Sequence, residues 1–191
     1  MSGTAESLIS LVPHRMEQWP GEIVPFTEWL LERRIHNVLE IGVRFGGTAS
    51  LWCGIATGKV VGIDWTGTDS LGDQTRILGN QMERQYSNYR FICGDSHKQE
   101  TYEQVLQHVD EVDFLFIDGD HSYAGIAKDF AMYSPLVRQG GCIAFHDIVD
   151  TELTRKYSLG VHKFWKELPV APKFEFCVGG EWGGIGAITY D

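Results

Sequence analysis

The chain has 191 residues, which is the length of one domain and too short for two full enzyme domains. Hydrophobic residues make up 43% of the sequence and aromatic residues 12%, so the chain can bury a sizeable core and is not a disordered protein. Its 26 acidic and 16 basic residues give a formal net charge of -10, and no local basic patch offsets it. Nucleic acid is therefore excluded as an expected partner, because its phosphates would be repelled.

The four cysteines, Cys53, Cys93, Cys142 and Cys177, are far apart in the sequence and form no CxxC motif. This usage predicts buried free thiols in a reducing compartment. No apolar run approaches the roughly 18 residues of a membrane span, and the first residues lack the basic-then-apolar order of a signal peptide. We therefore expect a cytoplasmic protein with no membrane partner.

The first predicted element is an amphipathic helix over Glu22–Arg34. Four of its apolar residues lie at helical spacing: Ile23, Phe26, Trp29 and Leu30. The helix is expected to pack either on a sheet or on a partner chain, and the second arrangement would make the protein a homo-oligomer. We divide the chain accordingly into an N-terminal helical arm, residues 1–36, and a main domain, residues 37–191.

In the main domain, short apolar runs alternate with helical stretches, which is typical of a parallel sheet. The predicted strands are Asn37–Gly42, Val60–Asp64, Tyr89–Cys93, Val112–Asp118 and Gly141–Asp147. The helices predicted between them are Thr48–Ala56, about Gln74–Gln85, Glu100–Val109 and Ala124–Tyr133. The expected fold is a doubly wound, Rossmann-like α/β sheet, with ligands at the carboxyl ends of the strands.

The last two predicted strands, Lys173–Val178 and Gly184–Tyr190, are joined by the short sequence GGEWG. This connection is too short for a crossover helix, so the pair is expected to form an antiparallel hairpin. The sheet is therefore expected to be mostly parallel, with an antiparallel last strand.

A glycine-rich turn, EIGVRFGGT, follows the first strand and opens a helix. Dinucleotide folds need a second glycine two residues after the first, and here that position is Arg44. The spacing favours a nucleotide-like ligand without a pyrophosphate, and S-adenosylmethionine fits; the alternative is a turn that only closes the strand-helix corner. The candidate cofactor-binding residues of this turn are Glu40, Gly42, Arg44 and Gly46. Arg44 is expected either to pair with the methionine carboxylate or to lie on the surface.

Acidic residues also follow the second and third strands. Asp64 ends the second strand and is well placed to bind the two ribose hydroxyls of such a cofactor. Asp95 and Ser96 follow the third strand, where they could hydrogen-bond the adenine amino group and a ring nitrogen. The alternative for this pair is a cap on the next helix.

The last two parallel strands end in IDGDHSY and FHD. Neighbouring parallel strands bring Asp118 and Asp147 within several ångströms, where the carboxylates repel unless a cation or a proton lies between them. Such oxygen ligands select Mg²⁺, with Mn²⁺ or Ca²⁺ as alternatives, and His146 could add a nitrogen ligand that favours a softer metal. In the simpler alternative, Asp120 and Asp147 cap the elements that follow and His121 is a surface residue.

The ordered motifs LEIGVRFGGTAS, GID, GDS, FIDGDHSYAGIAKDFAMYSPLVRQGG and IAFHD resemble class I S-adenosylmethionine-dependent methyltransferases. They are most similar to the metal-dependent O-methyltransferase branch that includes macrocin O-methyltransferase and the cephalosporin hydroxylase-like proteins. The resemblance covers about Asn37–Asp147 and implies a class I methyltransferase fold with an S-adenosylmethionine-binding domain over 37–191. It also implies that Asp118 and Asp147 hold a divalent metal, with Asp118 at the cofactor as well, and that His121 is the catalytic base.

The activity implied by this resemblance is methyl transfer from S-adenosylmethionine to a hydroxyl of a small molecule: a sugar, a polyol or a phenol. A metal would favour loss of the hydroxyl proton, which His121 can accept near neutral pH. Two alternatives remain. One is a degenerate, non-catalytic subunit that binds an S-adenosyl ligand, and the other is a nicotinamide-dependent oxidoreductase, against which Arg44 argues.

Overall fold

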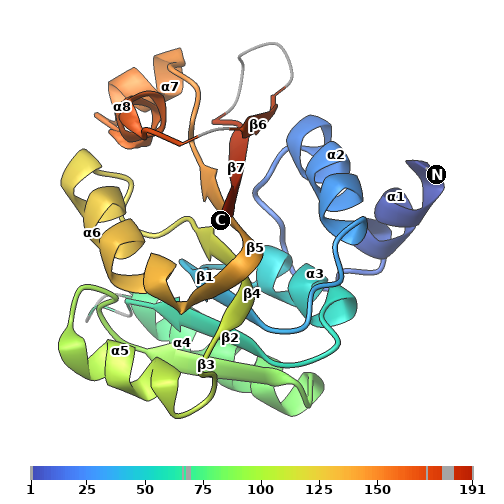
Figure 1. Cartoon of the computed structure of the whole chain (residues 1–191). Helices are drawn as coiled ribbons and strands as arrows, with labels where there is room; N and C mark the ends of the chain where they lie inside the picture. Colours follow the sequence, from blue (N-terminus) through green and yellow to red (C-terminus); the bar gives the residue numbers. More distant parts are fainter. Residues whose placement is uncertain (1, 66, 68–69, 171, 178–182, 191) are drawn as a thin grey trace.

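The computed structural model describes residues 2–65, 67, 70–170, 172–177 and 183–190, and its core is a seven-stranded sheet (Figure 1). The strands are β1 (Val38–Ile41), β2 (Val60–Asp64), β3 (Tyr89–Cys93), β4 (Val112–Ile117), β5 (Val137–His146), β6 (Lys173–Phe176) and β7 (Ile185–Tyr190). The helices are α1 (Ser2–Ser10), α2 (Pro20–Leu31), α3 (Gly47–Ile55), α4 (Ser70–Gln85), α5 (Gln99–Leu106), α6 (Tyr123–Tyr133), α7 (Glu152–Lys156) and α8 (Val161–Glu167), with a 3-10 turn at Ser134–Leu136.

The strand order is β3-β2-β1-β4-β5-β7-β6. The first five strands, β1 to β5, pair in parallel, whereas β7 is antiparallel to both of its neighbours, β5 and β6. The predicted doubly wound sheet with a reversed last strand is confirmed. The chain leaves β1 toward one edge of the sheet and returns to start β4 on the other side, and this switch point between β1 and β4 is where ligands of such sheets bind.

The differences from the expected elements are local. Strand β5 begins at Val137 instead of Gly141, because Val137 already pairs with Val112 before the register shifts within the strand. The expected end of the hairpin's first strand at Val178, and the joining residues 179–182, lie outside the described residues. Three short helices, α1, α7 and α8, had not been predicted, since segments of this length show little periodicity.

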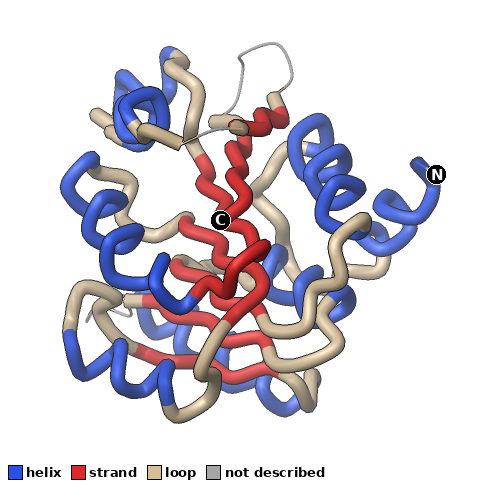
Figure 2. Tube along the Cα trace, in the orientation of Figure 1, coloured by secondary structure: helices blue, strands red, loops and turns tan. Residues whose placement is uncertain are grey.

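Helices cover both faces of the sheet (Figure 2). On one face, residues of α5, α6 and α8 share a core with alternate residues of the central strands, such as Leu39 and Leu115. On the other face, α2, α3 and α4 pack against the residues that point the opposite way, such as Val38 and Phe114. Both faces of the central strands β1 and β4 are therefore buried, which explains why their sequences are mostly apolar.

Helix α2 packs on the sheet of its own chain. The side chain of Phe26 is fully buried, with its ring centroid 5.8 Å from that of Phe114, 6.0 Å from Trp52 and 5.4 Å from Phe176. The expectation of an amphipathic helix is confirmed, and its apolar face is used within the chain. A homo-oligomer and the division at residue 36 stay predictions.

None of the four cysteines, all of which are described, forms a disulfide bond, and only two of them are buried. Cys53 and Cys142 are buried, whereas Cys93 and Cys177 are exposed, which corrects the expectation for these two. The reason is their place in the sheet, because Cys93 ends the edge strand β3 and Cys177 directly follows the other edge strand, β6. Within the described part of the chain, no helix has the length and apolar character needed to cross a membrane.

Replacing Phe26 by alanine should destabilise the whole domain, because it removes the ring on which four aromatic side chains of the sheet and α3 pack. We expect the free energy of unfolding to fall by about 3–5 kcal/mol. Urea denaturation of the full chain measures this change. Leu11→Ala is the control, since that side chain is 77% exposed and its loss should change stability by less than about 0.5 kcal/mol. Equal stability of the two variants would show that α2 is not part of the core.

Candidate functional site

A cleft of about 730 Å³ opens at the carboxyl ends of β1 to β4. Six of the predicted cofactor-binding residues line it: Gly42, Arg44, Asp64, Asp95, Ser96 and Asp118. His121, the predicted base, lines it as well. The sheet therefore brings these side chains to one edge, at the switch point of the fold.

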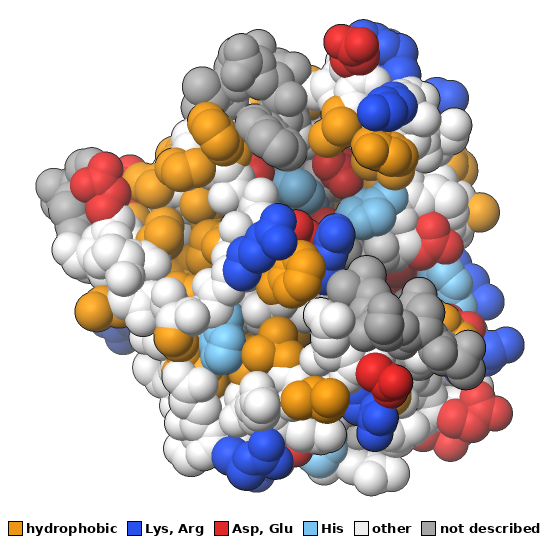
Figure 3. All heavy atoms as spheres, turned by 180° about the vertical axis from the view of Figure 1, so that it is seen from behind, with side chains coloured by type: hydrophobic (Ala, Val, Ile, Leu, Met, Phe, Trp, Pro, Cys, Tyr) orange, Lys and Arg blue, Asp and Glu red, His pale blue; other side chains and the backbone are white. Residues whose placement is uncertain are grey.

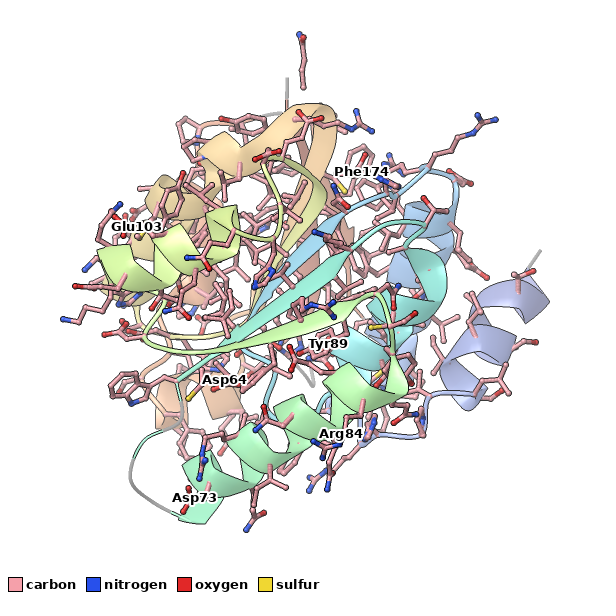
Figure 4. The ribbon with its side chains drawn as sticks, turned by 90° about the horizontal axis from the view of Figure 1, so that it is seen from below. Asp64, Asp73, Arg84, Tyr89, Glu103 and Phe174 are labelled. Carbon is pink, nitrogen blue, oxygen red and sulfur yellow. The ribbon has the colours of Figure 1, made fainter. Side chains whose placement is uncertain are left out.

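The glycine-rich turn after β1 is held by Asp64. Its Oδ2 atom accepts hydrogen bonds from the backbone N–H groups of Val43 (2.8 Å) and Arg44 (2.7 Å). Burial raises the pKa of the Asp64 carboxyl, although these two hydrogen bonds act in the opposite direction. Asp64 thus has a structural task in addition to its predicted contact with ribose, and Figure 4 shows it at the end of its strand.

Close backbone packing explains the first glycine of the turn. Gly42 has a φ of +92°, and a Cβ atom there would lie 2.2 Å from the carbonyl oxygen of Asp118. A side chain at this position would push β1 and β4 apart. The glycine-rich turn after β1 and the end of β4 are therefore in direct contact.

Two residues of the predicted cofactor set do not line the cleft. Gly46 begins helix α3, and a Cβ atom there would meet the sulfur of Met82 at 2.5 Å, so this glycine permits helix packing. Glu40 is fully buried in the sheet beneath α3. Both residues lie on the side of the turn that packs against the protein interior, and their contact with the cofactor stays a prediction.

Glu40 is a carboxyl group in an apolar setting. It lies near Thr48 and Trp52, but neither of its oxygens has a well-placed hydrogen-bond donor among the described residues. Burial raises the pKa of this carboxyl well above its ordinary value, so the folded state favours the neutral acid. Ionisation of Glu40 consequently opposes folding.

The third strand leads into a tight turn. The carboxylate of Asp95 accepts a hydrogen bond from the backbone N–H of His97 (2.9 Å) and does not cap the next helix, whose N-cap is Lys98. His97 also lines the cleft, and its Nε2 atom lies 3.2 Å from Asp129 Oδ1. Burial raises the pKa of Asp129 to about 6. The sequence gives no signal for this pair, because Asp129 lies 32 positions away on α6 and shares no motif with His97.

Asp118, His121 and Asp147 form a cluster that could hold a metal ion, since one ligand atom from each lies within 4.8 Å of the others. His121 Nδ1 is 2.9 Å from Asp147 Oδ2 and 3.9 Å from Asp118 Oδ1. On the face drawn in Figure 3, histidine and acidic side chains gather together, with Lys and Arg side chains beside them. The expected approach of Asp118 and Asp147 is thus reproduced, and His121 lies between them.

His146 lies beside this cluster, with Nδ1 3.3 Å from Asp118 Oδ1 and 3.7 Å from Asp147 Oδ1. Burial alone would lower the pKa of His146, but the nearby carboxylate of Asp118, together with those of Glu22 and Asp147, raises it well above its ordinary value. Burial likewise opposes protonation of His121, and the hydrogen bond to Asp147 with the charge of Asp118 raises its pKa. Without a metal, the carboxylates therefore attract protons to both imidazoles.

Asp147 has an unusual backbone. Its φ of +62° lies in the left-handed region, which a residue with a side chain rarely adopts. Burial raises the pKa of its carboxyl, but the hydrogen bond from His121 and the charges of both histidines outweigh burial and lower it. The strained conformation turns the carboxylate toward the histidines, and this is consistent with a functional role.

The N-terminal arm supplies residues to the site that sequence reasoning missed. Gln18 Nε2 donates to Asp118 Oδ2 at 2.8 Å, and Glu22 Oε1 lies 3.0 Å from His146 Nε2. Glu17 forms an ion pair with Arg44 at 2.9 Å, so Arg44 is both part of the cleft and paired with the arm. The mostly apolar helix PGEIVPFTEWLL contains two acidic residues, Glu22 and Glu28, and its sequence alone does not indicate which of them reaches the site.

Solved structures with the same fold are methyltransferases. The structure of a protein from Staphylococcus aureus described as a putative caffeoyl-CoA O-methyltransferase aligns with a TM-score of 0.69 and 16% identity over 100% of this chain and 92% of that one. An O-methyltransferase from Bacillus cereus, in complex with SAH, aligns with a TM-score of 0.66 and 19% identity over 98% and 91%. MycE from the mycinamycin biosynthetic pathway, in complex with Mg, SAH and mycinamycin VI, aligns with a TM-score of 0.62 and 18% identity over 97% of this chain and 53% of that one. The fold is the class I methyltransferase fold.

Residues 39–148, more than half of the chain, match the family model described as a methyltransferase domain. The chain belongs to this methyltransferase family. Among curated proteins it is 25% identical over 162 residues to the uncharacterized protein y4gI of Sinorhizobium fredii and 29% identical over 130 residues to the uncharacterized protein R132 of Acanthamoeba polyphaga mimivirus. The matches cover 80% and 65% of this chain but only 17% and 57% of those proteins.

Glu40→Gln should make the domain more stable than the wild type as the pH rises. The raised pKa of Glu40 means that the wild type loses stability from the unfolded-state value of about 4.3 upward, whereas glutamine has no proton to lose. Thermal melts between about pH 5 and about pH 9 measure the gap in Tm, which should widen by at least about 2–4 °C, equivalent to about 1 kcal/mol at this size. A gap that stays constant across this range contradicts the prediction.

Proposed function

We propose that this chain transfers a methyl group from S-adenosylmethionine to a hydroxyl of a small molecule, with the help of a divalent metal ion. The observation that carries the proposal is the contact between two half-sites. A nucleotide-sized cleft with an acidic residue after β2 adjoins a carboxylate and histidine cluster after β4 and β5. The methyl donor and the hydroxyl acceptor would therefore meet at the switch point of a methyltransferase fold.

The cleft fits the cofactor. Its volume of about 730 Å³ is within the usual range for a small-molecule site. Among the described residues, the backbone donors that bind Asp64 reach its Oδ2 atom, and its Oδ1 atom has no such donor, so Oδ1 is suited to ribose hydroxyls. S-adenosylhomocysteine (SAH) is what S-adenosylmethionine becomes after it has lost its methyl group. SAH is present in the related structures of the Bacillus cereus enzyme and MycE, which supports this assignment.

The cluster fits a divalent cation. Asp118 Oδ1 is buried and has no well-placed hydrogen-bond donor among the described residues, as expected for an atom that faces a cation. Asp118 and Asp147 would hold the metal, with His146 as a nitrogen ligand, and Mg²⁺ is the ion present in the related MycE structure. When bound, the ion supplies positive charge that makes the acceptor hydroxyl more acidic.

His121 is the group suited to take the acceptor proton. Its Nδ1–H donates to Asp147 Oδ2 at 2.9 Å, and this hydrogen bond leaves the lone pair on Nε2. The acceptor oxygen attacks the methyl carbon in line with the sulfonium, the carbon-sulfur bond breaks, and the thioether product leaves with both bonding electrons. The hydroxyl proton passes to His121 Nε2, so charge and atoms balance.

His121→Ala should lower kcat by about 10²- to 10⁴-fold, the usual contribution of a general base, and leave SAH affinity unchanged. Methyl transfer to an acceptor found by screening sugars, polyols and phenols measures kcat, and calorimetry measures SAH and metal binding. His36→Ala is the control, because His36 is an exposed residue before β1. If the alanine variant instead loses its metal while keeping SAH, His121 is a ligand and not the base.

Asp64→Ala should weaken SAH binding by about 1.5–3 kcal/mol, because it removes a charged acceptor from the ribose and from the glycine turn. Asp73→Ala is the matched control, since Asp73 lies on the first turn of α4 with a largely exposed side chain (Figure 4). Unchanged SAH affinity in the Asp64 variant would show that the ribose assignment is wrong.

Chelation distinguishes an active enzyme from a binding subunit. In excess EDTA we expect methyl transfer to fall to background and SAH affinity to stay the same, because the proposed metal ligands and Asp64 are different side chains. Full activity with EDTA contradicts the metal, and SAH binding without turnover over the whole acceptor panel supports the non-catalytic alternative.

A further inference from the structure

The carboxylate of Glu22 joins three separate parts of the chain. This side chain of α2 is 2% exposed, and its Oε1 atom accepts hydrogen bonds from the backbone N–H of Trp19 (2.8 Å) and lies 3.0 Å from His146 Nε2. Its Oε2 atom accepts a hydrogen bond from the backbone N–H of Gly184 (2.9 Å). A buried carboxylate with so many donors is held in one position.

This position determines how His146 faces the cluster. An imidazole has two nitrogens, and a hydrogen bond from Nε2–H to a carboxylate leaves Nδ1 with the lone pair. Nδ1 of His146 points toward Asp118 Oδ1 and Asp147 Oδ1, at 3.3 Å and 3.7 Å. Carboxylate, histidine and metal in this order are the usual way in which a second carboxylate orients a histidine ligand.

A second contact from the same arm acts on Asp118. Gln18 Nε2 donates to Asp118 Oδ2 at 2.8 Å, and this leaves the buried Oδ1 atom directed at the cluster. The arm thus orients one oxygen ligand through Gln18 and one nitrogen ligand through Glu22. Both residues lie before the part of the chain that matches the methyltransferase family, residues 39–148.

We propose that Glu22 is a positioning residue that makes His146 Nδ1 a metal ligand, so that the centre binds Mn²⁺ in preference to Mg²⁺. The inference rests on the proposed function, because it concerns the metal of that same site. Mg²⁺ favours oxygen ligands and dehydrates reluctantly, whereas a nitrogen ligand favours divalent transition-metal ions, and among these Mn²⁺ is the one that suits a site built mainly from carboxylates. His146 Nδ1 beside the carboxylates of Asp118 and Asp147 makes a mixed set of nitrogen and oxygen donors.

The test compares metal affinities of the full chain by calorimetry in the presence of SAH. Wild-type protein should bind Mn²⁺ at least about 10-fold more tightly than Mg²⁺. Glu22→Gln should weaken Mn²⁺ binding by about 10- to 100-fold, the usual effect of losing such an outer carboxylate, and should reduce the preference for Mn²⁺. Glutamine keeps the side-chain length and still offers an acceptor to Trp19 N–H.

The matched control is Glu32→Gln, an exposed glutamate at the end of the same helix, which should bind both ions as the wild type does. Pulsed electron paramagnetic resonance of bound Mn²⁺ provides a readout that a purely structural role would not change. Coupling to nitrogen is expected in the wild type and in Glu32→Gln, and it should be weaker in Glu22→Gln. His146→Ala should show the same loss, and it serves as the test if the Glu22 variant does not fold.

Tighter binding of Mg²⁺ than of Mn²⁺ by the wild type overturns the inference. Equal nitrogen coupling of bound Mn²⁺ in the wild type and in His146→Ala overturns it as well. Wild-type Mn²⁺ affinity in a Glu22→Gln protein of unchanged Tm overturns the role of Glu22. If wild-type protein with bound SAH takes up neither ion, His146 acts as a fixed positive charge among the carboxylates and the inference is wrong. Failure of the wild type to bind SAH contradicts the proposed function itself, which keeps the two results distinguishable.

Discussion

The parallel register of β1, β2 and β4 is the constraint on which the site depends. Ile41 pairs with Ile63 on one side and with Ile117 on the other, so the three strands end level with one another. The residues that follow, among them Asp64 and Asp118, therefore emerge at the same edge of the sheet. Because this register is set by buried apolar side chains on both faces, the packing of the core and the spacing of the polar groups cannot change independently.

The second constraint is electrostatic. Three carboxylates, those of Glu22, Asp118 and Asp147, surround His146 in a buried region of a chain that is already acidic overall. Carboxylates at these distances in a poorly solvated place need compensating positive charge, which protons on the histidines supply in the absence of a metal. Binding of the proposed metal ion would therefore displace these protons.

Much of the site could be predicted from sequence because its residues directly follow apolar strands. Asp64, Asp118 and Asp147 were found in this way, since the end of a strand is visible in the sequence and its edge of the sheet follows from the fold. The same reasoning assigned Gly46 to the cofactor, although its lack of a side chain serves the contact with Met82. A glycine in a turn has several physical uses, and the sequence alone does not distinguish them.

Gln18 and Glu22 could not be predicted, for a different reason. They reach their partners, Asp118 and His146, over separations of 100 and 124 residues, and only the packing of α2 on the sheet brings them there. Neither belongs to a motif. Helix α2 was expected from its apolar spacing, but that pattern describes the face that packs and gives no information about a polar residue buried at its start.

The contact between Glu22 and Gly184 spans 162 positions in the sequence. A contact of such high order forms late, because the chain must first lose the entropy of closing a long loop. During synthesis, strands β1 to β4 and their cleft can assemble while the final hairpin is still inside the ribosome. Glu22 is held in place only after β7 has joined the sheet, so the cleft, which is lined by residues between Ile41 and His121, can form before the contacts that orient His146.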